Sequence, residues 1–456
     1  MNAEFNPDSA LQFNPVMTER RIKAAQQREA VIALLKKGVW VYIILLLTEG
    51  AIRKWGIPKL AAPLLIVRDP VAIWMLFVAL KNGVFPTNNY VWAMSFTAIF
   101  AFFTALSIGH GSMAVAFYGT RILLIHFPMM FLIGKLFDRE DVLRFGKMML
   151  WISMPMLVLI AVQFYSPQSS FINRGVGGDL AGGGFAGALG FFRPPGTFSF
   201  TSGNTQFWSV VGLFVVYFWL NPSSVNRILL IASSICLIAS VPLSISRTLI
   251  FQVVITVFFA FISVSRNPKY IGRMVLAIVG IAGAIMLLNK LEFFQKSTEA
   301  LVSRYSDASD VEGGLEGTLG NRFLGQLLGA VQSTDQPFFG YGIGMGTNVG
   351  AKLLTGDVEF LIAEEEWGRL IGEMGTVMGL LVIFIRVSFC IKAGWLSFRR
   401  LAQRDMLPWI ILSMAFVFIA QSQWAQPTTL GFSTLVGGLL ISALKVEVPV
   451  GDAEHS

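Results

Sequence analysis

The sequence predicts an all-α, polytopic membrane protein with about twelve transmembrane helices. Hydrophobic residues make up 54% of the 456 residues and charged residues only 14%, whereas soluble domains carry roughly 25% charged residues. Apolar runs of about 18 residues or more recur along the chain, and each can cross a hydrocarbon core about 30 Å thick. This composition excludes disordered, collagen-like and nucleic-acid-binding proteins, because a chain this apolar would aggregate in water.

The apolar runs define the predicted spans. They are residues 38–55, 60–80, 90–108, 114–135, 145–165, 205–220, 227–245, 247–265, 271–289, 368–391, 407–424 and 428–444. Both cysteines, Cys236 and Cys390, lie inside such runs, so the sequence predicts neither a disulfide framework nor a zinc site. The net charge of +8 fits basic residues that are retained in cytoplasmic loops.

The N-terminal segment, residues 1–37, is polar and basic. Residues 18–36 have the pattern of a basic amphipathic helix on the anionic cytoplasmic leaflet, with Thr18 as its N-cap. No short apolar core with a cleavage site follows, so we expect no cleaved signal peptide. The predicted organisation is therefore this segment, a single transmembrane domain at 38–445 and a cytoplasmic tail at 446–456.

Basic residues set the predicted orientation. With the N-terminus inside, the cytoplasmic side receives most of the lysines and arginines, as the positive-inside rule requires. They lie in the N-terminal cluster, at 81, in the 135–147 loop, at 227, and at 266–273, 392–404 and 445. An even number of spans places the C-terminus inside too. Two long connections, 166–204 and 290–367, then fall outside, so we expect any chemistry at the outer membrane surface.

The first outer loop and the next tight connection each supply an arginine. A glycine-rich run at 175–190 precedes Arg-Pro-Pro-Gly-Thr-Phe at 193–198, which fixes Arg193 at the mouth of the sixth span. The alternative for the glycine run alone is a flexible loop. Ser246 and Arg247 separate the seventh and eighth spans. Arg247 is either a snorkelling arginine or an anion ligand, since a guanidinium can hold a phosphate with two parallel hydrogen bonds.

The second outer loop carries more motif residues. Gly320, Asn321 and Arg322 precede a helical pattern at 323–331 that fits an amphipathic helix on the membrane. Arg322 would lie at its N-terminus, where the helix dipole also favours an anion. Then follow Pro337, Phe338, Phe339, Gly340, Tyr341, Gly342, Ile343 and Gly344. No strand precedes this glycine repeat and no Lys-Ser/Thr pair follows it, so nucleotide binding is excluded.

Carboxylates stand at the end of the second outer loop. Glu364, Glu365 and Glu366 lead into the tenth span and include candidates for a general base, because like-charged neighbours raise carboxylate pKa values. The alternative is a solvated acidic loop end. Arg369 and Glu373 are four residues apart on one helix face and are expected to pair.

Further charged residues lie within the predicted spans. Glu49 and Arg53 have the same four-residue spacing, and Arg68 with Asp69 suggests a buried polar pair at a helix break. Arg121 and Arg386 are the other intramembrane arginines. The three histidines, His110, His126 and His455, support neither a Ser-His-Asp triad nor a histidine-rich metal site, since none lies on a long outer loop.

These motifs, in order over residues 190–390, resemble those of the O-antigen ligase and O-antigen polymerase superfamily of bacterial envelope enzymes. The matching pieces are Arg-Pro-Pro-Gly-Thr-Phe at 193–198, Ser-Arg-Thr at 246–248, Gly-Asn-Arg at 320–322, Pro-Phe-Phe-Gly-Tyr-Gly-Ile-Gly at 337–344 and Gly-Glu-Met-Gly at 372–375. Residues 1–165 add only topology to the likeness.

The resemblance implies a cofactor-free, metal-independent, inverting glycosyl transfer on the outer face of the bacterial inner membrane. The donor would be a glycan on undecaprenyl diphosphate, and the acceptor a glycan hydroxyl. Arg193, Arg247 and Arg322 would hold the diphosphate, and one of the three consecutive glutamates would accept the proton. Ser246, Asn321, Gly340, Gly342, Gly344, Arg369 and Glu373 would help to bind substrate. A chain-length regulator is a further candidate partner.

One departure from the motifs of the family bears on whether the protein is a ligase or a polymerase. Ligases of this family carry a histidine and an asparagine ahead of the Glu-X-Gly motif, and Glu364 and Glu365 hold those places here. The arginine-to-glycine spacing typical of polymerases also fails for Arg193 and Arg322. We expect a polymerase of exopolysaccharide, capsule or O-antigen repeat units, with a ligase as the runner-up. Two further functions stay open: a flippase for lipid-linked oligosaccharides and a non-catalytic subunit of a secretion complex.

Overall fold

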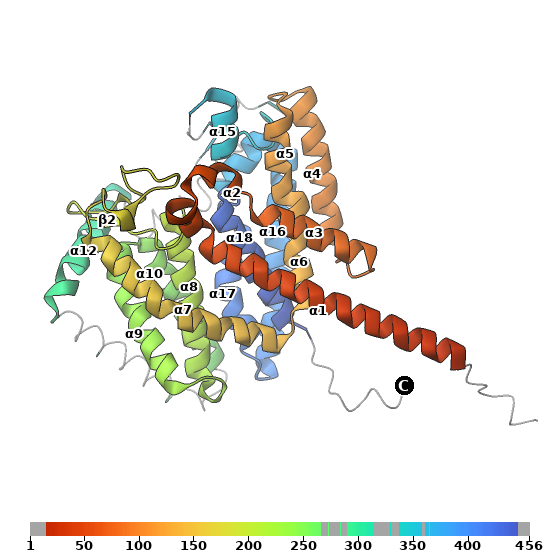
Figure 1. Ribbon diagram of the computed structural model, residues 1–456, viewed down its shortest axis with the longest axis horizontal. Helices are drawn as coiled ribbons and strands as arrows, with labels where there is room; N and C mark the ends of the chain where they lie inside the picture. The colour runs from red at the N-terminus through yellow and green to blue at the C-terminus, as the bar shows by residue number, and fades with distance from the viewer. Residues whose placement is uncertain are drawn as a thin grey trace, which may run out of the picture.

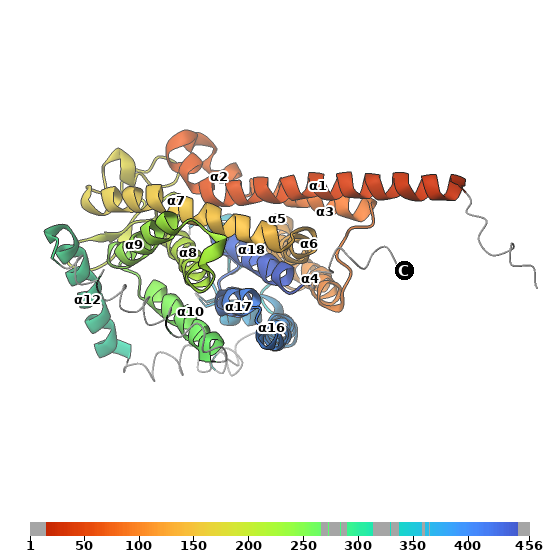
Figure 2. The same ribbon diagram turned by 90° about the horizontal axis from the view of Figure 1, so that it is seen from below.

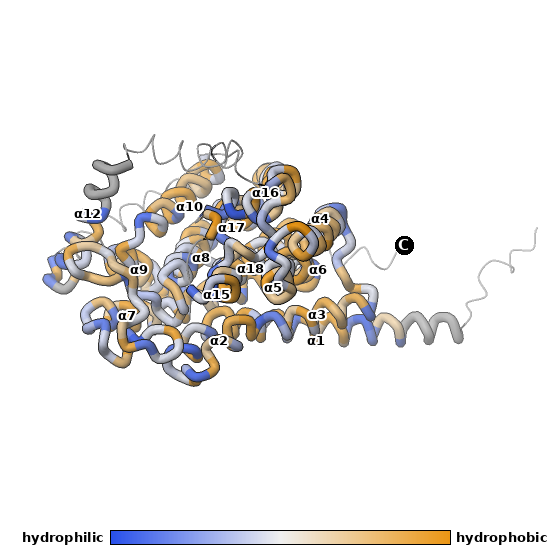
Figure 3. Tube along the Cα trace, turned by 90° about the horizontal axis from the view of Figure 1, so that it is seen from above, coloured by the Kyte–Doolittle hydropathy of each residue, from blue (hydrophilic) through white to orange (hydrophobic). Residues whose placement is uncertain are grey.

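The computed structural model describes residues 15–265, 272, 283, 290–312, 329, 337–357, 361–363 and 365–445. Within these residues the regular secondary structure is helical apart from a short hairpin, β1 (Phe185–Ala186) paired with β2 (Phe192–Arg193). Figure 1 shows long helices packed side by side, and Figure 3 shows that hydrophobic residues predominate along helices such as α4 and α10. The predicted all-α, membrane-embedded class is therefore confirmed.

Eight of the predicted spans meet the length and apolarity of a membrane crossing within the described residues. They are Lys23–Gly56, Pro58–Lys81, Asn89–Ser107, Met113–Leu136, Arg139–Tyr165, Arg227–Ser244, Arg247–Ser265 and Glu366–Ala402. The sixth predicted span coincides with α8 (Thr201–Leu220). The last two are the shorter apolar helices α17 (Leu407–Ala420) and α18 (Pro427–Ala443). The span at 271–289 falls outside the described residues.

The N-terminal segment and the first span form one continuous helix, α1 (Pro15–Ala51). Thr18 lies inside this helix and does not cap it, which corrects the prediction of a separate surface helix at 18–36. The physical reason is that no proline interrupts the run after Pro15. A Cβ on Gly38 would lie 2.9 Å from Met75 and Trp74 of α3 (Arg68–Lys81), so Gly38 lets these two helices approach closely. The N-terminal half of α1 projects from the helical body (Figures 1 and 2).

Two spans contain π-helical turns near buried charges. The π-turn η2 (Ile52–Gly56) ends α1, and η3 (Pro58–Leu60) and α2 (Ala61–Leu64) lead into α3. A second π-turn, η4 (Ile122–His126), joins α5 (Met113–Arg121) to α6 (Phe127–Leu136). Such turns redirect side chains and frequently occur at functional sites.

The core is built around α18, whose residues are almost all buried. It packs on α6, where a Cβ on Gly134 would lie 2.5 Å from Ile441, and one on Gly438 would lie 2.6 Å from Ile133. Small residues let membrane helices approach closely, and van der Waals packing then stabilises the pair. The helices α16 (Glu366–Ala402) and α17 complete this central group (Figure 1).

The connections gather at two ends of the helical body. At one, called the loop end below, hydrogen bonds join Lys54 to Gly196, Ser202 to Gln426, His110 to Ile343 and Arg304 to Ile245. At the other, they join Lys36 to Asp138 and Asp141, Arg139 to Asp405, and Lys445 to Lys135 and Phe137. The first set connects loops predicted outside and the second connects segments predicted inside. The long helix α16 runs between them.

Candidate functional site

Three arginines from three elements meet at the loop end. Arg193 ends β2, Arg247 begins α10 (Arg247–Ser265), and Arg304 lies on α12 (Glu292–Glu312). Arg304 donates a hydrogen bond of 3.2 Å to the carbonyl of Ile245, in the turn before α10. Figure 1 shows β2 and α12 on the same side of the molecule, beside α10. We call Arg193, Arg247 and Arg304 the arginine cluster.

The turn that presents Arg247 is locally specified. Pro242 lies in the last turn of α9 (Arg227–Ser244), and Ile245 adopts a left-handed conformation with φ 44°. The Ser246 hydroxyl accepts a 3.3 Å hydrogen bond from the Leu249 amide and lies 3.0 Å from the Thr205 hydroxyl on α8. Ser246 therefore caps the start of α10 and ties it to α8, which fixes the position of Arg247.

The arginines of the cluster repel one another. Burial and the charges of Arg304 and Arg247 together lower the pKa of Arg193 to about 10. Burial and the charge of Arg247 also lower the pKa of Arg304. The Nε of Arg193 is buried and has no hydrogen-bond partner among the described residues. Like charges held together in this way favour a multiply charged anion between them.

The first outer loop holds Arg193 in place from several sides. Gly196 has φ 60°, its carbonyl accepts hydrogen bonds from Lys54 (2.6 Å) and Gln163 (3.2 Å), and its amide donates to Gln163 (2.8 Å). The Asn204 amide donates to the Pro194 carbonyl at 3.0 Å. Along the Arg-Pro-Pro-Gly turn the loop is therefore anchored to η2, α7 (Arg139–Tyr165) and α8.

The glycine repeat after Pro337 docks against a break in α16. Gly375 has φ 73° and ψ 170° inside that helix, so the carbonyls before it lose their helical partners. The amide of Tyr341 donates to the Gly372 carbonyl, and that of Gly342 donates to the Glu373 carbonyl, each at 2.8 Å. A Cβ on Gly340 would collide with the backbone of Glu373 and Gly375. Two motifs that are separate in the sequence thus form one joint.

Gly342 and Gly344 make the second face of this joint. Both have positive φ, 111° and 96°. A Cβ on Gly342 would lie 2.6 Å from the His110 ring, and one on Gly344 would collide with the carbonyl of Val115. The His110 Nε2 donates to the Ile343 carbonyl at 3.2 Å, while its Nδ1 accepts from the Ser112 amide at 3.0 Å. The repeat therefore allows close backbone packing.

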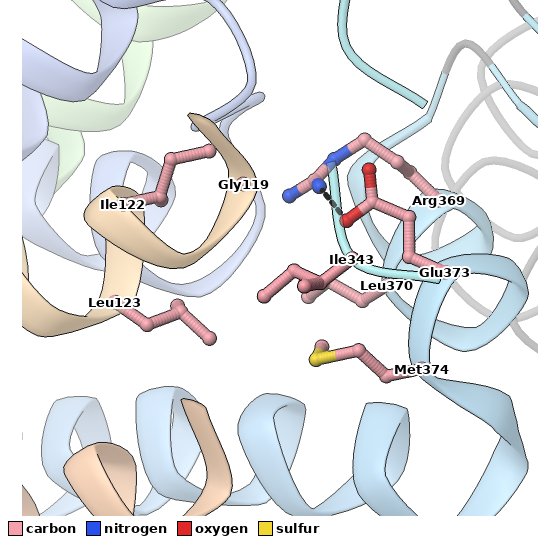
Figure 4. A pocket seen from close by; sticks show the side chains of 8 residues that line it. All are labelled: Gly119, Ile122, Leu123, Ile343, Arg369, Leu370, Glu373 and Met374. Atoms are coloured by element: carbon pink, nitrogen blue, oxygen red, sulfur yellow. Dashed lines mark hydrogen bonds and ion pairs between the residues drawn. The ribbon is translucent and has the colours of Figure 1, made fainter. Parts of the chain in front are cut away.

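The carboxylates and arginines of α16 neutralise one another. Glu366, Arg369, Glu373 and Arg386 are all buried, and we call them the α16 ion network. Arg369 lies 3.0 Å from Glu366 and 2.6 Å from Glu373, and Arg386 lies 2.5 Å from Glu366. The predicted pair between Arg369 and Glu373 is confirmed, and Figure 4 shows it beside a recess whose other lining residues are apolar.

Backbone groups complete the α16 ion network. The second carboxylate oxygen of Glu373 accepts from the Gly346 amide at 2.9 Å, and Glu366 accepts from the Trp424 amide at 3.1 Å. Arg386 donates to the carbonyl of Ile419 at 2.5 Å. These hydrogen bonds use the donors and acceptors of the network. They attach both the glycine repeat and the chain before α18 to α16. Glu365, in contrast, is exposed and precedes the first turn of α16.

The structure brings only some of the predicted site residues together. The structure brings Arg193 and Arg247 together, and adds Arg304, which sequence reasoning missed. The available signal was a basic residue on the amphipathic helix at 292–312, inside the second outer connection. Asn321, Arg322, Glu364 and, except for Gly329, the helix expected at 323–331 fall outside the described residues. The backbone and ion-pair contacts described above involve the other predicted site residues, which are Ser246, Gly340, Gly342, Gly344, Glu366, Arg369 and Glu373.

Comparisons of the chain with protein-family models, with curated proteins and with solved structures return no match.

Proposed function

We propose that this protein transfers a glycan from a lipid diphosphate to a hydroxyl of an acceptor glycan, as a polymerase of envelope polysaccharide repeat units. The lipid of the proposed donor is undecaprenyl, the membrane is the bacterial inner membrane, and the loop end faces outward. The observation that carries the proposal is the arginine cluster. It places three guanidiniums at the end of an apolar helical body, where a lipid-borne diphosphate would lie.

The cluster suits the leaving group. In the proposed step the acceptor oxygen attacks the anomeric carbon, the bond from that carbon to the diphosphate oxygen breaks, and the configuration inverts. Negative charge develops on the departing diphosphate, and guanidiniums that are already oriented stabilise it most effectively. The buried Nε of Arg193 has no partner among the described residues, so this guanidinium keeps an unsatisfied donor.

The acceptor hydroxyl must lose a proton to a base. A base has to reach the substrate, so the proposal excludes the Glu366 and Glu373 carboxylates, which are enclosed in the α16 ion network. Glu365 is exposed at the start of α16 and takes this role in the proposal, with Glu364 beside it in the sequence. Arg369, Glu373, Ser246 and the three glycines of the 340–344 repeat become positioning residues.

The test is a transfer assay with the purified protein in detergent, undecaprenyl-diphosphate oligosaccharide from the host and EDTA. A product ladder that is lost in Arg193→Gln and Arg304→Gln would support the polymerase. Glu365→Gln is expected to lose transfer while it keeps donor binding. Lys147→Gln, a change at the end of the molecule away from the loop end, serves as the matched charge-removal control. A ladder that persists in Arg193→Gln and Arg304→Gln would contradict the proposal.

Two competing functions give different outcomes in the same assay. A single shifted band that requires an added acceptor lipid would indicate a ligase. Absence of product, with substrate and fold verified, would favour a flippase for lipid-linked oligosaccharides. One observation favours the flippase as second candidate: the π-helical turns η2 and η4 interrupt two spans beside buried charges, and interrupted helices are typical of transporter binding sites.

A further inference from the structure

The glycine-rich part of the first outer loop is apolar as well as exposed. Between Gly175 and Phe192, Asp179 is the only charged residue. Loops that face water are built mainly from polar residues, and grouped exposed apolar side chains mark a surface that meets a partner. We call residues 175–192 the apolar loop. Its exposed large apolar residues are Leu180, Phe185, Leu189 and Phe192.

The tip of the β1–β2 hairpin shows the same preference at a single residue. The Phe191 amide donates to the Ala188 carbonyl at 2.9 Å. The two residues between them, Leu189 and Gly190, have positive φ, 51° and 77°. Such a turn favours asparagine, aspartate or glycine at its first central position, because other residues are strained there. Leu189 nevertheless holds this position with its side chain 61% exposed. Apolar surroundings would favour a leucine at this tip, whereas water would not.

The apolar loop follows a helix face of the kind that contacts lipid. The helix α7 has the length and apolarity of a membrane span. Its exposed residues Trp151, Val158, Val162 and Tyr165 lie on one face, since they are 7, 4 and 3 residues apart. Tyr165 ends α7, and Phe171 is exposed in the next turn, η5 (Phe171–Asn173). The chain therefore enters the apolar loop from a lipid-facing surface.

A second exposed apolar turn lies against the same loop. A Cβ on Gly178 would lie 3.4 Å from Pro58, which begins η3 between the first two spans. Ile57 and Leu60, on either side of this turn, are both exposed. Figure 1 shows the loop that precedes β2 at the edge of the molecule, beside the turn from η2 to α2. Two irregular segments from different parts of the chain thus present apolar side chains at the same end of the spans.

Buried charges attach the base of this connection to the spans. Arg53 lies 3.2 Å from Glu49, which confirms the predicted pair, and the same guanidinium nitrogen donates to the Ser199 hydroxyl at 2.9 Å. The sequence also predicts a pair of Arg68 with its neighbour Asp69, but Arg68 lies 3.2 Å from Glu49 and pairs with that residue. These contacts fix the position of the connection relative to the ends of the first two spans.

The backbone limits how deep the apolar loop can lie. A lipid-exposed irregular segment is excluded from the hydrocarbon core, because its amides and carbonyls would lack partners there. Apolar side chains on a surface segment instead reach roughly 5–10 Å into the boundary between headgroups and acyl chains. Arg174, whose Cζ lies 5.1 Å from the Phe171 ring, and the exposed Lys59 fit this level. Basic side chains at that level can reach lipid phosphates.

We propose that the apolar loop is a membrane-binding element, whose partner is the lipid leaflet at the loop end. Leu180, Phe185, Leu189 and Phe192 insert among the lipid headgroups. Arg193 directly follows Phe192 and is the hairpin partner of Phe185. Insertion therefore holds the arginine cluster at the level of the lipid phosphates. The inference goes beyond the proposed function, because the loop would insert in the same way in a protein without transfer activity.

The experiment places a fluorescent NBD label on the loop of the full-length protein, in nanodiscs of phosphatidylethanolamine and phosphatidylglycerol. The label is attached at Leu189→Cys, and the two buried native cysteines are removed by Cys236→Ala and Cys390→Ala. We expect quenching by lipids with a nitroxide near the headgroup end of the acyl chain. We also expect dithionite, added in water, to bleach the label about tenfold more slowly than at the control position. Asp357→Cys, at an exposed polar position of the second outer connection, is the matched control.

Leu180→Cys is the second labelling position, which keeps the test valid if a change at the strained Leu189 prevents folding. The thermal unfolding temperature of each labelled protein verifies its fold. Bleaching at both loop positions as fast as at Asp357→Cys would place the loop in water and overturn the proposal. Slow bleaching without nitroxide quenching would show that protein covers the loop, and would also overturn it. Neither measurement uses a glycan donor, so failure of this inference is distinct from failure of the proposed function.

Discussion

The α16 ion network and the arginine cluster use the same residue type in opposite ways. In the network, Arg369 and Arg386 face Glu366 and Glu373 at 2.5–3.0 Å, and the charges balance. In the cluster, by contrast, the charges that act on Arg193 within the described part of the chain are those of Arg304 and Arg247. Both include residues of the sequence motifs: Arg193 and Arg247 in the cluster, and Glu373 in the network. Motif membership therefore does not separate a residue that holds the fold from one that is available to a ligand.

The balance of charge distinguishes arginines that hold the fold from arginines that can bind a ligand. A buried ion pair with saturated hydrogen bonds has little left to offer a substrate, and its loss exposes the remaining partner to a low-dielectric interior. Guanidiniums held close together repel one another in the free protein. A bound anion offsets this repulsion, so its binding is favoured. The comparison predicts opposite signs for charge removal in the two regions.

Arg386→Met should have the largest effect on stability. It leaves the Glu366 carboxylate buried without its 2.5 Å partner and frees the carbonyl of Ile419. Removal of one partner of a buried pair costs about 3–5 kcal/mol. We expect a large fall in the thermal unfolding temperature in detergent, read from intrinsic tryptophan fluorescence.

Two controls make this result specific. Arg144→Met removes an exposed arginine that lies 3.5 Å from Glu140, and such a change is worth about 0–1 kcal/mol. The double variant Arg386→Met with Glu366→Gln removes both charges and should recover part of the loss. If Arg386→Met unfolds at the parental temperature, the network is not structural.

Gly375→Ala should rank second. The added Cβ would collide with the Phe338 carbonyl, at a residue whose φ is 73°. A non-glycine residue in this region costs about 1–3 kcal/mol, and the collision adds overpacking of similar size. Gly190→Ala is the matched control, since Gly190 has φ 77° with open space around it and bears only the backbone term. Equal unfolding temperatures for the two variants would contradict the joint between the motifs.

Much of the helical framework follows from the sequence. Eight of the expected spans were placed by apolar runs, and the pairs Arg369–Glu373 and Glu49–Arg53 by their four-residue spacing. Both signals are local: hydropathy needs about 18 contiguous residues, and helical geometry fixes which side chains are neighbours. Local signals also explain the wrong boundary that the sequence predicts at residue 37. The polarity of the sequence changes there, although the helix α1 continues.

The partners of buried charges depend on tertiary contacts. Arg386 meets Glu366 across 20 residues and Arg68 meets Glu49 across 19, so no local spacing indicates them. Arg304 joins Arg193 and Arg247 only because α12 folds back beside the α9–α10 turn. Likewise, the glycine repeat signals close packing, but its partner is set by the break at Gly375, which a run of helical residues conceals.

Arg304→Gln should change stability in the opposite direction from Arg386→Met. It removes a charge that lowers the pKa of Arg193, so repulsion within the cluster decreases. We expect stability to rise by less than about 1 kcal/mol, since Arg304 is only partly buried. Binding of inorganic pyrophosphate should weaken at the same time. Destabilisation by several kcal/mol would instead place Arg304 among the structural arginines.

The smallest expected effect is a pH dependence of anion binding at the cluster. The pKa of Arg193 is lowered to about 10 by burial and by its two neighbouring arginines, so this guanidinium is charged below that pH and loses its proton above it. A bound anion raises the pKa again, and binding is then coupled to proton uptake. Pyrophosphate affinity should therefore fall as the pH rises through about 10, by at most about tenfold per pH unit. Calorimetric titrations from about pH 8 to about pH 11 measure this slope.

Arg193→Gln should lose this component of the slope, because no titrating guanidinium remains at that position. An identical slope in the variant would show that the anion binds away from Arg193, and the contrast between the cluster and the α16 ion network would then rest on Arg247 and Arg304 alone.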